Sequence, residues 1–317
     1  MNGGFSVDAE SDHLKARIAW FYFVAGMTQQ EIADQLEITR LRVNKIIGIV
    51  RAEGAVVVDL RMPMIECIKL EEELKVRFGL EEVMVVPAVQ DYQGSQRTIG
   101  EAAGIVLDSH VSRRHGIGVG WGNTLSFAVR RITERRLKNS WVVGMMGAVA
   151  RGSGINTFEL STALAQSLDV ECHYLTAPIY CATSEARAIL LQHDEISAVM
   201  KKAEEAEVGL VSCGDLTHRS PVMPLAVIKE NLPALLELGA VGEVLGCFLD
   251  PDGNIVPHPI NQSIMALPLE ELKKKPVSIL ASGGRTKLPI IRSVLRGRYV
   301  NRLVTDDVVA RALVYES

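Results

Sequence analysis

Glycine-rich loops that follow short apolar runs are the segments of this sequence best suited to bind a small molecule. The first reads Gly118-Val119-Gly120-Trp121-Gly122-Asn123-Thr124. It fails the GxGxxG dinucleotide pattern in every register and has no Walker lysine. It offers a glycine turn, the hydrogen-bonding side chains of Asn123 and Thr124, and a helix that begins near Thr124. This predicts a cradle for a phosphate or hydroxyl group, with a tight turn that binds nothing as the alternative.

Three further loops supply charged groups to the same kind of position. Residues 282–287 place Lys287 and a second basic residue beside two glycines at a helix start, where the helix dipole favours an anion. Residues 147–154 bring Arg151 to a strand end, and Glu243 follows a flexible glycine. Carboxylates accept hydrogen bonds from sugar hydroxyls. Together the loops predict a site for a sugar or polyol phosphate, whereas residues 250–253 read as a plain Asp-Gly turn.

A different chemistry is indicated near the N-terminus, at residues 28–52. Thr28 and Glu31 have the spacing of a capping box, and Thr39 is a second N-cap. The second helix then carries an apolar stripe at the helical period, formed by Val43, Ile46, Ile47 and Val50. Two short amphipathic helices separated by a three-residue turn predict a helix-turn-helix unit. An ordinary helical hairpin with a solvated basic face is the alternative.

The exposed face of this second helix suits the major groove of DNA. Its charged residues are all basic until residue 53. The N-terminal residues of a recognition helix approach base edges, so Arg40 and Lys45 are the expected base readers and Leu41 can contact a thymine methyl. The expected phosphate contacts are Thr39, Arg42, Asn44 and Gln29.

Flanking segments complete a small DNA-binding domain. An apolar helix over 13–25 precedes the pair. The β-branched segment 55–62, in which polar and apolar residues alternate, predicts a strand or wing. Glu37 stands where a glycine would ease the turn, so a looser turn is expected. Pro63 marks the boundary between domains 1–63 and 64–317. The amphipathic helix expected over 65–78 is either a linker or a dimer contact.

The remainder of the chain has the pattern of an α/β domain. Short apolar runs alternate with helical segments from residue 82 onward. The runs are VMVVPA, GIGVG, WVVGMMG, VECHYLTAP, EVGLVSCG, EVLGCFLD, VSILASGG and RLVTD. Runs that are apolar on both faces, with helices between them, predict a parallel sheet in a layered α/β fold. Ligands bind such sheets outside the carboxyl ends of the strands.

Composition narrows the functional classes. The chain has 317 residues and a net charge of −4, so its positive charge is local. This excludes a protein that binds nucleic acid nonspecifically through its overall charge. The five cysteines form no CxxC pair, which predicts reduced thiols, a cytoplasmic protein and neither a metal nor a cofactor. The polar first residues do not form a signal sequence, and no apolar run reaches the roughly 20 residues of a membrane span.

These motifs together resemble the SorC family of bacterial transcriptional regulators. The segments that carry the resemblance are TQQEIADQL…RVNKII, GVGWGNT, GAVGEVLGCFLDPDG and SGGRTKLPIIRSVLRGRYVNRLVTDD, between about Leu14 and Leu313. The resemblance implies a dimer or tetramer that regulates sugar or polyol catabolism. It also implies an effector domain similar in fold to glucosamine-6-phosphate deaminase and ribose-5-phosphate isomerase. The implied effector contacts are Gly122, Asn123, Thr124, Arg151, Glu243 and Lys287.

The leading hypothesis is therefore a regulator, not an enzyme, that binds double-stranded operator DNA and responds to a small sugar or polyol. The first loop lacks the threonine-rich form of some family members, so a neutral polyol stays open beside a phosphorylated effector. The rival is a sugar-phosphate isomerase or deaminase with an appended DNA-binding domain. Glu243, Asp215 and His218 are its candidate acid–base residues. Residues 215–219, however, read more simply as a surface loop.

Overall fold

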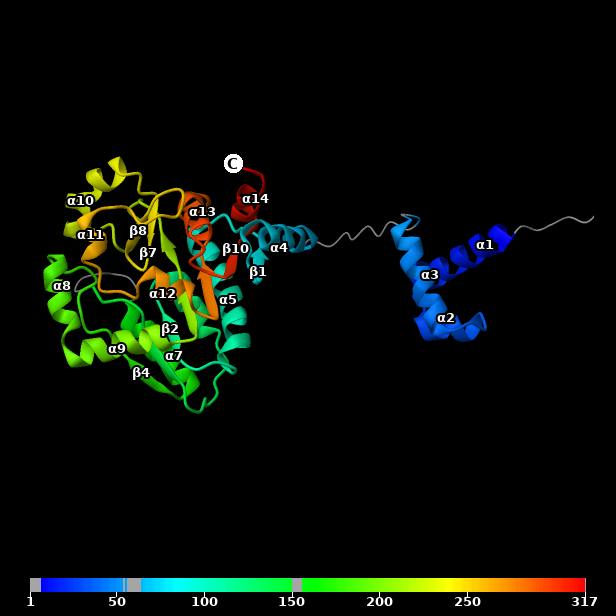
Figure 1. The fold of residues 1–317 in the computed structure, drawn as a ribbon, viewed down its shortest axis with the longest axis horizontal. Helices are drawn as coiled ribbons and strands as arrows, with labels where there is room; N and C mark the ends of the chain where they lie inside the picture. Colours follow the sequence, from blue (N-terminus) through cyan, green and yellow to red (C-terminus); the bar gives the residue numbers. More distant parts are fainter. Residues whose placement is uncertain (1–6, 54, 56–63, 150–155, 317) are drawn as a thin grey trace, which may run out of the picture. The chain divides into compact units, whose positions relative to one another are not determined.

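The computed structural model describes residues 7–53, 55, 64–149 and 156–316. The chain divides into two compact units, residues 1–62 and residues 63–317, called the head and the body below (Figure 1). Within the described residues no helix is long and apolar enough to cross a membrane.

The head is built from helices around a small apolar core. They are α1 (Val7–Ala19), a π-helical turn (Trp20–Val24), α2 (Gln29–Gln35) and α3 (Arg40–Ala52). Ile18, Ile32, Val43 and Ile47 are each at most 3% exposed and form the core. The predicted single helix over 13–25 is thus wrong in its bounds. The helix begins earlier and widens into a π-turn where four aromatic residues follow one another.

Both predicted N-caps are present in the head. The Thr28 hydroxyl accepts a hydrogen bond from the Glu31 N–H at 3.3 Å, and the Glu31 carboxylate accepts one from the Thr28 N–H at 2.7 Å. The Thr39 hydroxyl caps α3 by accepting from the Arg42 N–H. The expectation of a loose turn is wrong, because Glu37 adopts the left-handed conformation (φ 54°) that a glycine would supply. The predicted wing at 55–62 lies outside the described residues except for Ala55.

A seven-stranded sheet forms the centre of the body. Its order is β1-β10-β9-β5-β2-β3-β4, and every neighbouring pair is parallel, which confirms the expected α/β architecture. The strands are β1 (Glu82–Val86), β2 (Ile117–Val119), β3 (Trp141–Gly144), β4 (Glu171–His173), β5 (Val208–Val211), β9 (Val277–Ala281) and β10 (Arg302–Asp306). Because all run the same way, their carboxyl ends lie along one edge.

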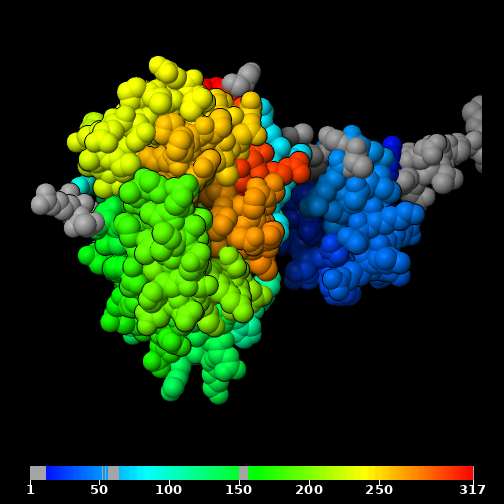
Figure 2. Space-filling view, turned by 60° about the vertical axis from the view of Figure 1, so that its left-hand side comes forward, coloured from blue at the N-terminus to red at the C-terminus, as the bar shows by residue number. Residues whose placement is uncertain are grey.

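Helices connect and cover these strands. They are α4 (Ile65–Phe78), α5 (Tyr92–Val111), α6 (Asn123–Arg130), α7 (Thr157–Leu168), α8 (Ser184–Leu191), α9 (Asp194–Glu205), α10 (Ala226–Glu237), α11 (Pro259–Gln262), α12 (Leu269–Lys273), a 3₁₀ turn (Arg285–Lys287), α13 (Leu288–Arg296) and α14 (Asp307–Tyr315). In the space-filling view the green-to-yellow segment from α8 to α10 covers much of one face of the body (Figure 2).

One apolar run does not join the parallel sheet. The run EVLGCFLD, expected as one buried strand, contributes to β7 (Gly242–Val244) and β8 (Cys247–Leu249). β7 pairs antiparallel with β8 on one side and with β6 (Cys213–Gly214) on the other. Leu245 (φ 52°) and Gly246 (φ 81°) make the two-residue turn between β7 and β8. Two successive positive φ angles match the turn that a twisted hairpin requires. The hairpin places Glu243 on a strand, and not beyond a strand end as expected.

The close packing of α5 against α6 fixes the start of α6. A methyl group added at Gly100 would lie 2.4 Å from the Thr124 carbonyl oxygen and 2.6 Å from the Phe127 Cβ. No side chain fits there unless α6 moves, so Gly100 sets the distance between the two helices.

We expect Gly100→Ala to lower the free energy of unfolding by about 1–3 kcal/mol, because the added methyl group overpacks this contact. Urea denaturation followed by circular dichroism measures the change. Ile105→Ala on the same helix is the matched control, since Ile105 is 49% exposed. Equal unfolding midpoints for Gly100→Ala and the wild type would contradict the packing described here.

Candidate functional site

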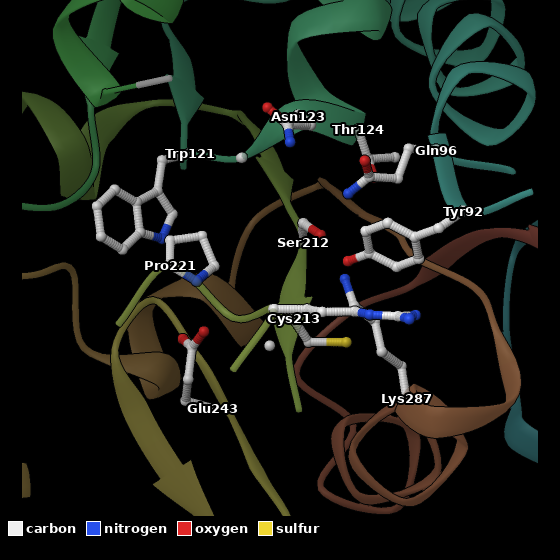
Figure 3. A pocket seen from close by; sticks show the side chains of 13 residues that line it. Tyr92, Gln96, Trp121, Asn123, Thr124, Ser212, Cys213, Pro221, Glu243 and Lys287 are labelled. Carbon is white, nitrogen blue, oxygen red and sulfur yellow. The ribbon is translucent and has the colours of Figure 1, made fainter. Parts of the chain in front are cut away.

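A pocket opens at the carboxyl edge of the parallel sheet, where loops from distant parts of the sequence meet (Figure 3). Its cavity volume is about 60 Å³, which leaves room for a few water molecules or a small polyol. Its lining residues are Tyr92, Gln96, Trp121, Gly122, Asn123, Thr124, Ser212, Cys213, Gly214, Arg219, Pro221, Glu243 and Lys287.

The start of α6 forms one wall of the pocket. Gly122 has a φ of 118°, which side-chain-bearing residues rarely adopt, and it turns the chain from β2 into the helix. Within the described part of the chain no side chain caps α6, so the N–H groups of its first turn stay available to a ligand. The Thr124 side chain is 4% exposed, and the side chains of Asn123 and Thr124 stand on the same wall (Figure 3).

Glu243 supplies a buried carboxylate. It is 3% exposed and accepts hydrogen bonds from the Gly246 N–H at 2.9 Å and the Ser220 hydroxyl at 3.5 Å. A methyl group at Gly214 would lie 2.2 Å from the carboxylate, so only glycine leaves it room. Burial raises the pKa of Glu243 above its ordinary value, although the Gly246 N–H and the charge of Lys287 act in the opposite direction.

Lys287 brings a positive charge to the same pocket. Lys287 is 8% exposed. Its positive charge acts to lower the pKa of both Glu243 and Asp215, although burial leaves the pKa of Glu243 raised. Asp215 is 4% exposed, so the expected surface loop begins with a buried carboxylate. Burial tends to raise the pKa of Asp215, but hydrogen bonds from Thr217 and Thr286 outweigh it and the pKa is lowered. The prediction of a surface loop over residues 215–219 is therefore wrong at Asp215, which is buried.

The thiol in the pocket is held in its neutral form. Cys213 donates to the Ser282 hydroxyl at 3.2 Å, and burial raises the pKa of this thiol to about 11. A thiol with such a pKa is a poor nucleophile near pH 7. Cys213 therefore contributes shape to the pocket and no covalent chemistry.

Tyr92 and Arg219 are among the lining residues that sequence reasoning missed. The Arg219 guanidinium lies 4.8 Å from the centre of the Tyr92 ring, a cation–π distance. Tyr92 opens α5 directly after β1 and its loop, so the rule that ligands bind at strand ends applied to it too. The same rule could have found Arg219, which follows the apolar run ending at Gly214, but residues 215–219 were interpreted as a surface loop.

The structure brings together most of the predicted effector residues. Gly122, Asn123, Thr124, Glu243 and Lys287 all line this pocket, although three separate segments carry them. Arg151 lies outside the described residues. His218, a candidate of the enzyme hypothesis, is absent from the described lining.

The predicted DNA contacts lie on α2, α3 and the turn between them, in the head. Leu41 is 79% exposed, and Arg40, Arg42, Asn44 and Lys45 are exposed as well. Thr39 uses its hydroxyl to cap α3. The Gln29 side-chain amide donates to the Asn44 side-chain oxygen at 3.3 Å, so these two predicted phosphate contacts are hydrogen-bonded to each other.

Comparison with known proteins identifies the family. A family model described as a sugar-binding domain, Sugar-bind, matches residues 62–315. The chain belongs to the SorC family of sugar-responsive transcriptional regulators.

Among the described residues, no cluster of three or more His, Cys, Asp or Glu side chains is arranged to hold a metal ion.

Three relatives of this family member span almost the whole chain. The deoxyribonucleoside regulator of Bacillus subtilis is 27% identical over 311 residues, which are 97% of this chain and 99% of the relative. The erythritol catabolism regulatory protein EryD of Brucella abortus is 28% identical and covers 96% of each chain. The full-length sorbitol operon regulator SorC of Klebsiella pneumoniae shares the fold, with a TM-score of 0.74, 24% identity and coverage of 96% and 99%.

Replacing the buried carboxylate should stabilise the unliganded protein in a pH-dependent way. Because the pKa of Glu243 is raised on folding, wild-type stability falls as the pH rises from the ordinary value of 4.5 through the folded-state pKa. We expect Glu243→Gln to unfold at a higher urea concentration than the wild type at pH 7, with the difference vanishing near pH 4.5. Glu230→Gln, an exposed change on α10, is the control. A less stable Glu243→Gln variant at pH 7 would refute this.

Proposed function

We propose that the head binds operator DNA of a carbohydrate or polyol catabolic operon, and that a small sugar or polyol in the body pocket changes this binding. The effector carries a phosphate or a comparable anionic group. The body binds this effector and releases it unchanged. The proposal rests above all on the chemistry of one pocket, which combines a buried ammonium group and a buried carboxylate with a helix N-terminus.

The two signs of charge match the two kinds of group on a sugar phosphate. Lys287, Arg219 and the uncapped first turn of α6 attract an anion. Glu243 and the neighbouring amides and hydroxyls accept or donate hydrogen bonds as alcohol groups require. The relatives are named after a deoxyribonucleoside, erythritol and sorbitol, all of which carry several hydroxyl groups.

Several features favour binding over catalysis. The Glu243 carboxylate already accepts hydrogen bonds from Gly246 and Ser220, which hold it in place. The neutral Cys213 thiol is unsuited to nucleophilic attack. The relatives that match the chain are named as regulators. A pocket that only binds hydroxyl groups needs the fixed carboxylate and does not need a reactive nucleophile.

The head fits a helix-turn-helix unit with α3 as its recognition helix. The apolar stripe of α3 is buried, and the opposite face presents Arg40, Leu41 and Lys45 to solvent. We assign Gln29, Thr39, Arg42 and Asn44 to contacts with the DNA backbone. Two half-sites require two heads, so we assign the working form to a dimer or tetramer and the operator to an inverted repeat.

Fluorescence anisotropy at a fixed salt concentration tests the proposal as a whole. The labelled DNA comes from upstream of the protein's own gene and the neighbouring operon. The added compounds are sorbitol, erythritol and 2-deoxyribose, each with and without a terminal phosphate. A change in DNA affinity with the compound recovered intact supports the proposal. Consumption of a compound without specific DNA binding would establish the enzyme instead.

Lys45→Ala should remove sequence discrimination at one position of the operator while leaving the head folded. The loss of one base contact corresponds to about 1–3 kcal/mol of discrimination against the wrong base. Competition between operator and scrambled DNA measures it. Arg17→Ala is the charge-matched control, because Arg17 is exposed on α1. Identical competition curves for Lys45→Ala and the wild type would remove Lys45 from the base-reading set.

Lys287→Met should weaken effector binding about 10- to 100-fold, because a hydrogen bond to a charged group is lost in a buried site. DNA affinity without effector should be unchanged. Isothermal titration with the active compound measures the first quantity, and anisotropy measures the second. Lys229→Met, exposed on α10, is the control. Wild-type effector affinity in Lys287→Met would place this side chain outside the site.

A further inference from the structure

The buried carboxylate of Asp306 contacts the loop that carries Lys287 (residues 282–287, called the effector loop below). The Gly284 N–H donates to Asp306 Oδ2 at 2.6 Å, and a methyl group at Gly283 would lie 2.3 Å from the same oxygen. The Gly284 carbonyl in turn accepts from the Lys287 N–H at 2.9 Å. The position of Gly284, and with it the turn that presents Lys287, therefore depends on Asp306.

The other oxygen of the same carboxylate caps a different element. Asp306 Oδ1 accepts from the Val309 N–H at 2.8 Å and is the N-cap of α14. Asp306 is 2% exposed, so water does not compete for either bond. Hydrogen bonds to an ionised acceptor are stronger than neutral ones, and a helix N-terminus favours the negative charge. Asp306 thus fixes the distance between the effector loop and the first turn of α14.

Further contacts join the two segments along their length. Arg285, next to Gly284, forms an ion pair with Glu316 at 3.0 Å. Arg292 of α13 donates to the carbonyl oxygens of Ala312 at 3.1 Å and Glu316 at 3.0 Å. The effector loop, α13 and α14 are therefore connected at both ends of α14.

On its other side α14 is joined to α4, the helix beside which it lies in Figure 1. The Tyr315 hydroxyl donates to the Glu73 carboxylate at 2.9 Å. Arg77 donates to the Val314 carbonyl oxygen, and Arg311 lies 3.8 Å from Glu66. Leu70 and Leu74 of α4 are fully or almost fully buried in the same apolar core as Val309 and Leu313.

The place of α4 in the chain gives these contacts a consequence. α4 begins at Ile65 and is the first helix of the body, reached from α3 through residues 53–64. Anything that displaces α4 acts on the segment that connects the body to the predicted recognition helix. An effector can change DNA affinity only through contacts that differ between two states.

We propose that Asp306 is the positioning residue that transmits effector binding to the DNA-binding head, through α14 and then α4. The proposal rests on the function proposed above and specifies its regulation. An effector that draws Lys287 into the pocket moves Gly284, and Asp306 converts that movement into a shift of α14 against α4. Asp306 touches neither the effector nor DNA.

Asp306→Ser separates the two bonds of the carboxylate. A serine hydroxyl still caps α14, but one short hydroxyl cannot also reach Gly284. The quantity measured is the ratio of DNA affinities with and without a saturating concentration of the compound that is active on the wild type in the sugar and sugar-phosphate panel. We expect the ratio, roughly 5–150 for typical allosteric coupling, to fall to about 1 in Asp306→Ser. Its DNA affinity without the compound should stay at the wild-type level.

Saturation distinguishes transmission from a purely local role. If Asp306 only orients Lys287, effector affinity falls but the full change in DNA affinity returns at saturation, and that result would overturn the proposal. Asp307→Ser is the matched control, since it removes an acid one residue later, whose partners are the Ala88 N–H and Arg311 and not the loop. Loss of the response in both variants to the same extent would also overturn it. Asp306→Asn, which keeps one acceptor oxygen for the cap, replaces the serine variant if that one does not fold.

Two additional measurements test the route, and the second of them needs no effector. Tyr315→Phe removes one α14–α4 hydrogen bond, and its effect on the ratio should not add to that of Asp306→Ser if both lie on one route. Hydrogen exchange of residues 65–78 should be faster in Asp306→Ser than in Asp307→Ser. If no compound of the panel affects wild-type DNA binding, the proposed function fails, and this exchange result alone decides the coupling. Equal exchange in the two variants would reject it.

Discussion

The burial of two opposite charges, Glu243 and Lys287, is the constraint on which the pocket depends. Each is at most 8% exposed, and the desolvation of a lone buried charge costs several kcal/mol. The charge of Lys287 acts to lower the pKa of Glu243, but burial has the larger effect and the pKa is raised. Lys287 thus offsets part of the cost of burying the carboxylate, and burial still destabilises its ionised form. The surrounding backbone also accommodates the Glu243 carboxylate, since Gly214 leaves room for it and the Gly246 N–H donates a hydrogen bond to it.

The parallel sheet explains how residues so distant in sequence reach one pocket. Strands β2, β5 and β9 are consecutive neighbours in the central part of the sheet, and the loops after all three contribute to the site. Crossover connections are required between parallel strands, and the loops after β2 and β9 are followed closely by a helix start, whereas β5 leads first into the short strand β6. The antiparallel hairpin of β7 and β8 then adds the carboxylate from outside this repeating pattern.

Local sequence patterns predicted those parts of the structure that local physics determines. The capping residues Thr28 and Thr39 and the bounds of α4 follow from side-chain chemistry within one helical turn. The apolar runs predicted the sheet, because parallel strands are buried on both faces. The strand-end rule then gathered Gly122, Asn123, Thr124 and Lys287 without knowledge of the strand order.

Non-local effects account for what the sequence did not reveal. Glu37 adopts an unfavourable φ because packing on both sides of the turn determines its conformation. The lowered pKa of Asp215 depends in part on a hydrogen bond from Thr286, 71 residues later in the chain. The antiparallel pairing of β7 with β6 joins segments separated by α10, and no pattern within either segment specifies it.

The hydrogen bond between Gln29 and Asn44 affects the energetics of the head. The two side chains hold α2 and α3 together across the turn before any DNA is present. Their rotamer entropy is therefore partly lost during folding and not during association. A DNA phosphate that binds either side chain exchanges one hydrogen bond for another, so the net gain per contact is small. Preorganisation of the two helices, and not the strength of these individual contacts, is what the pair contributes to recognition.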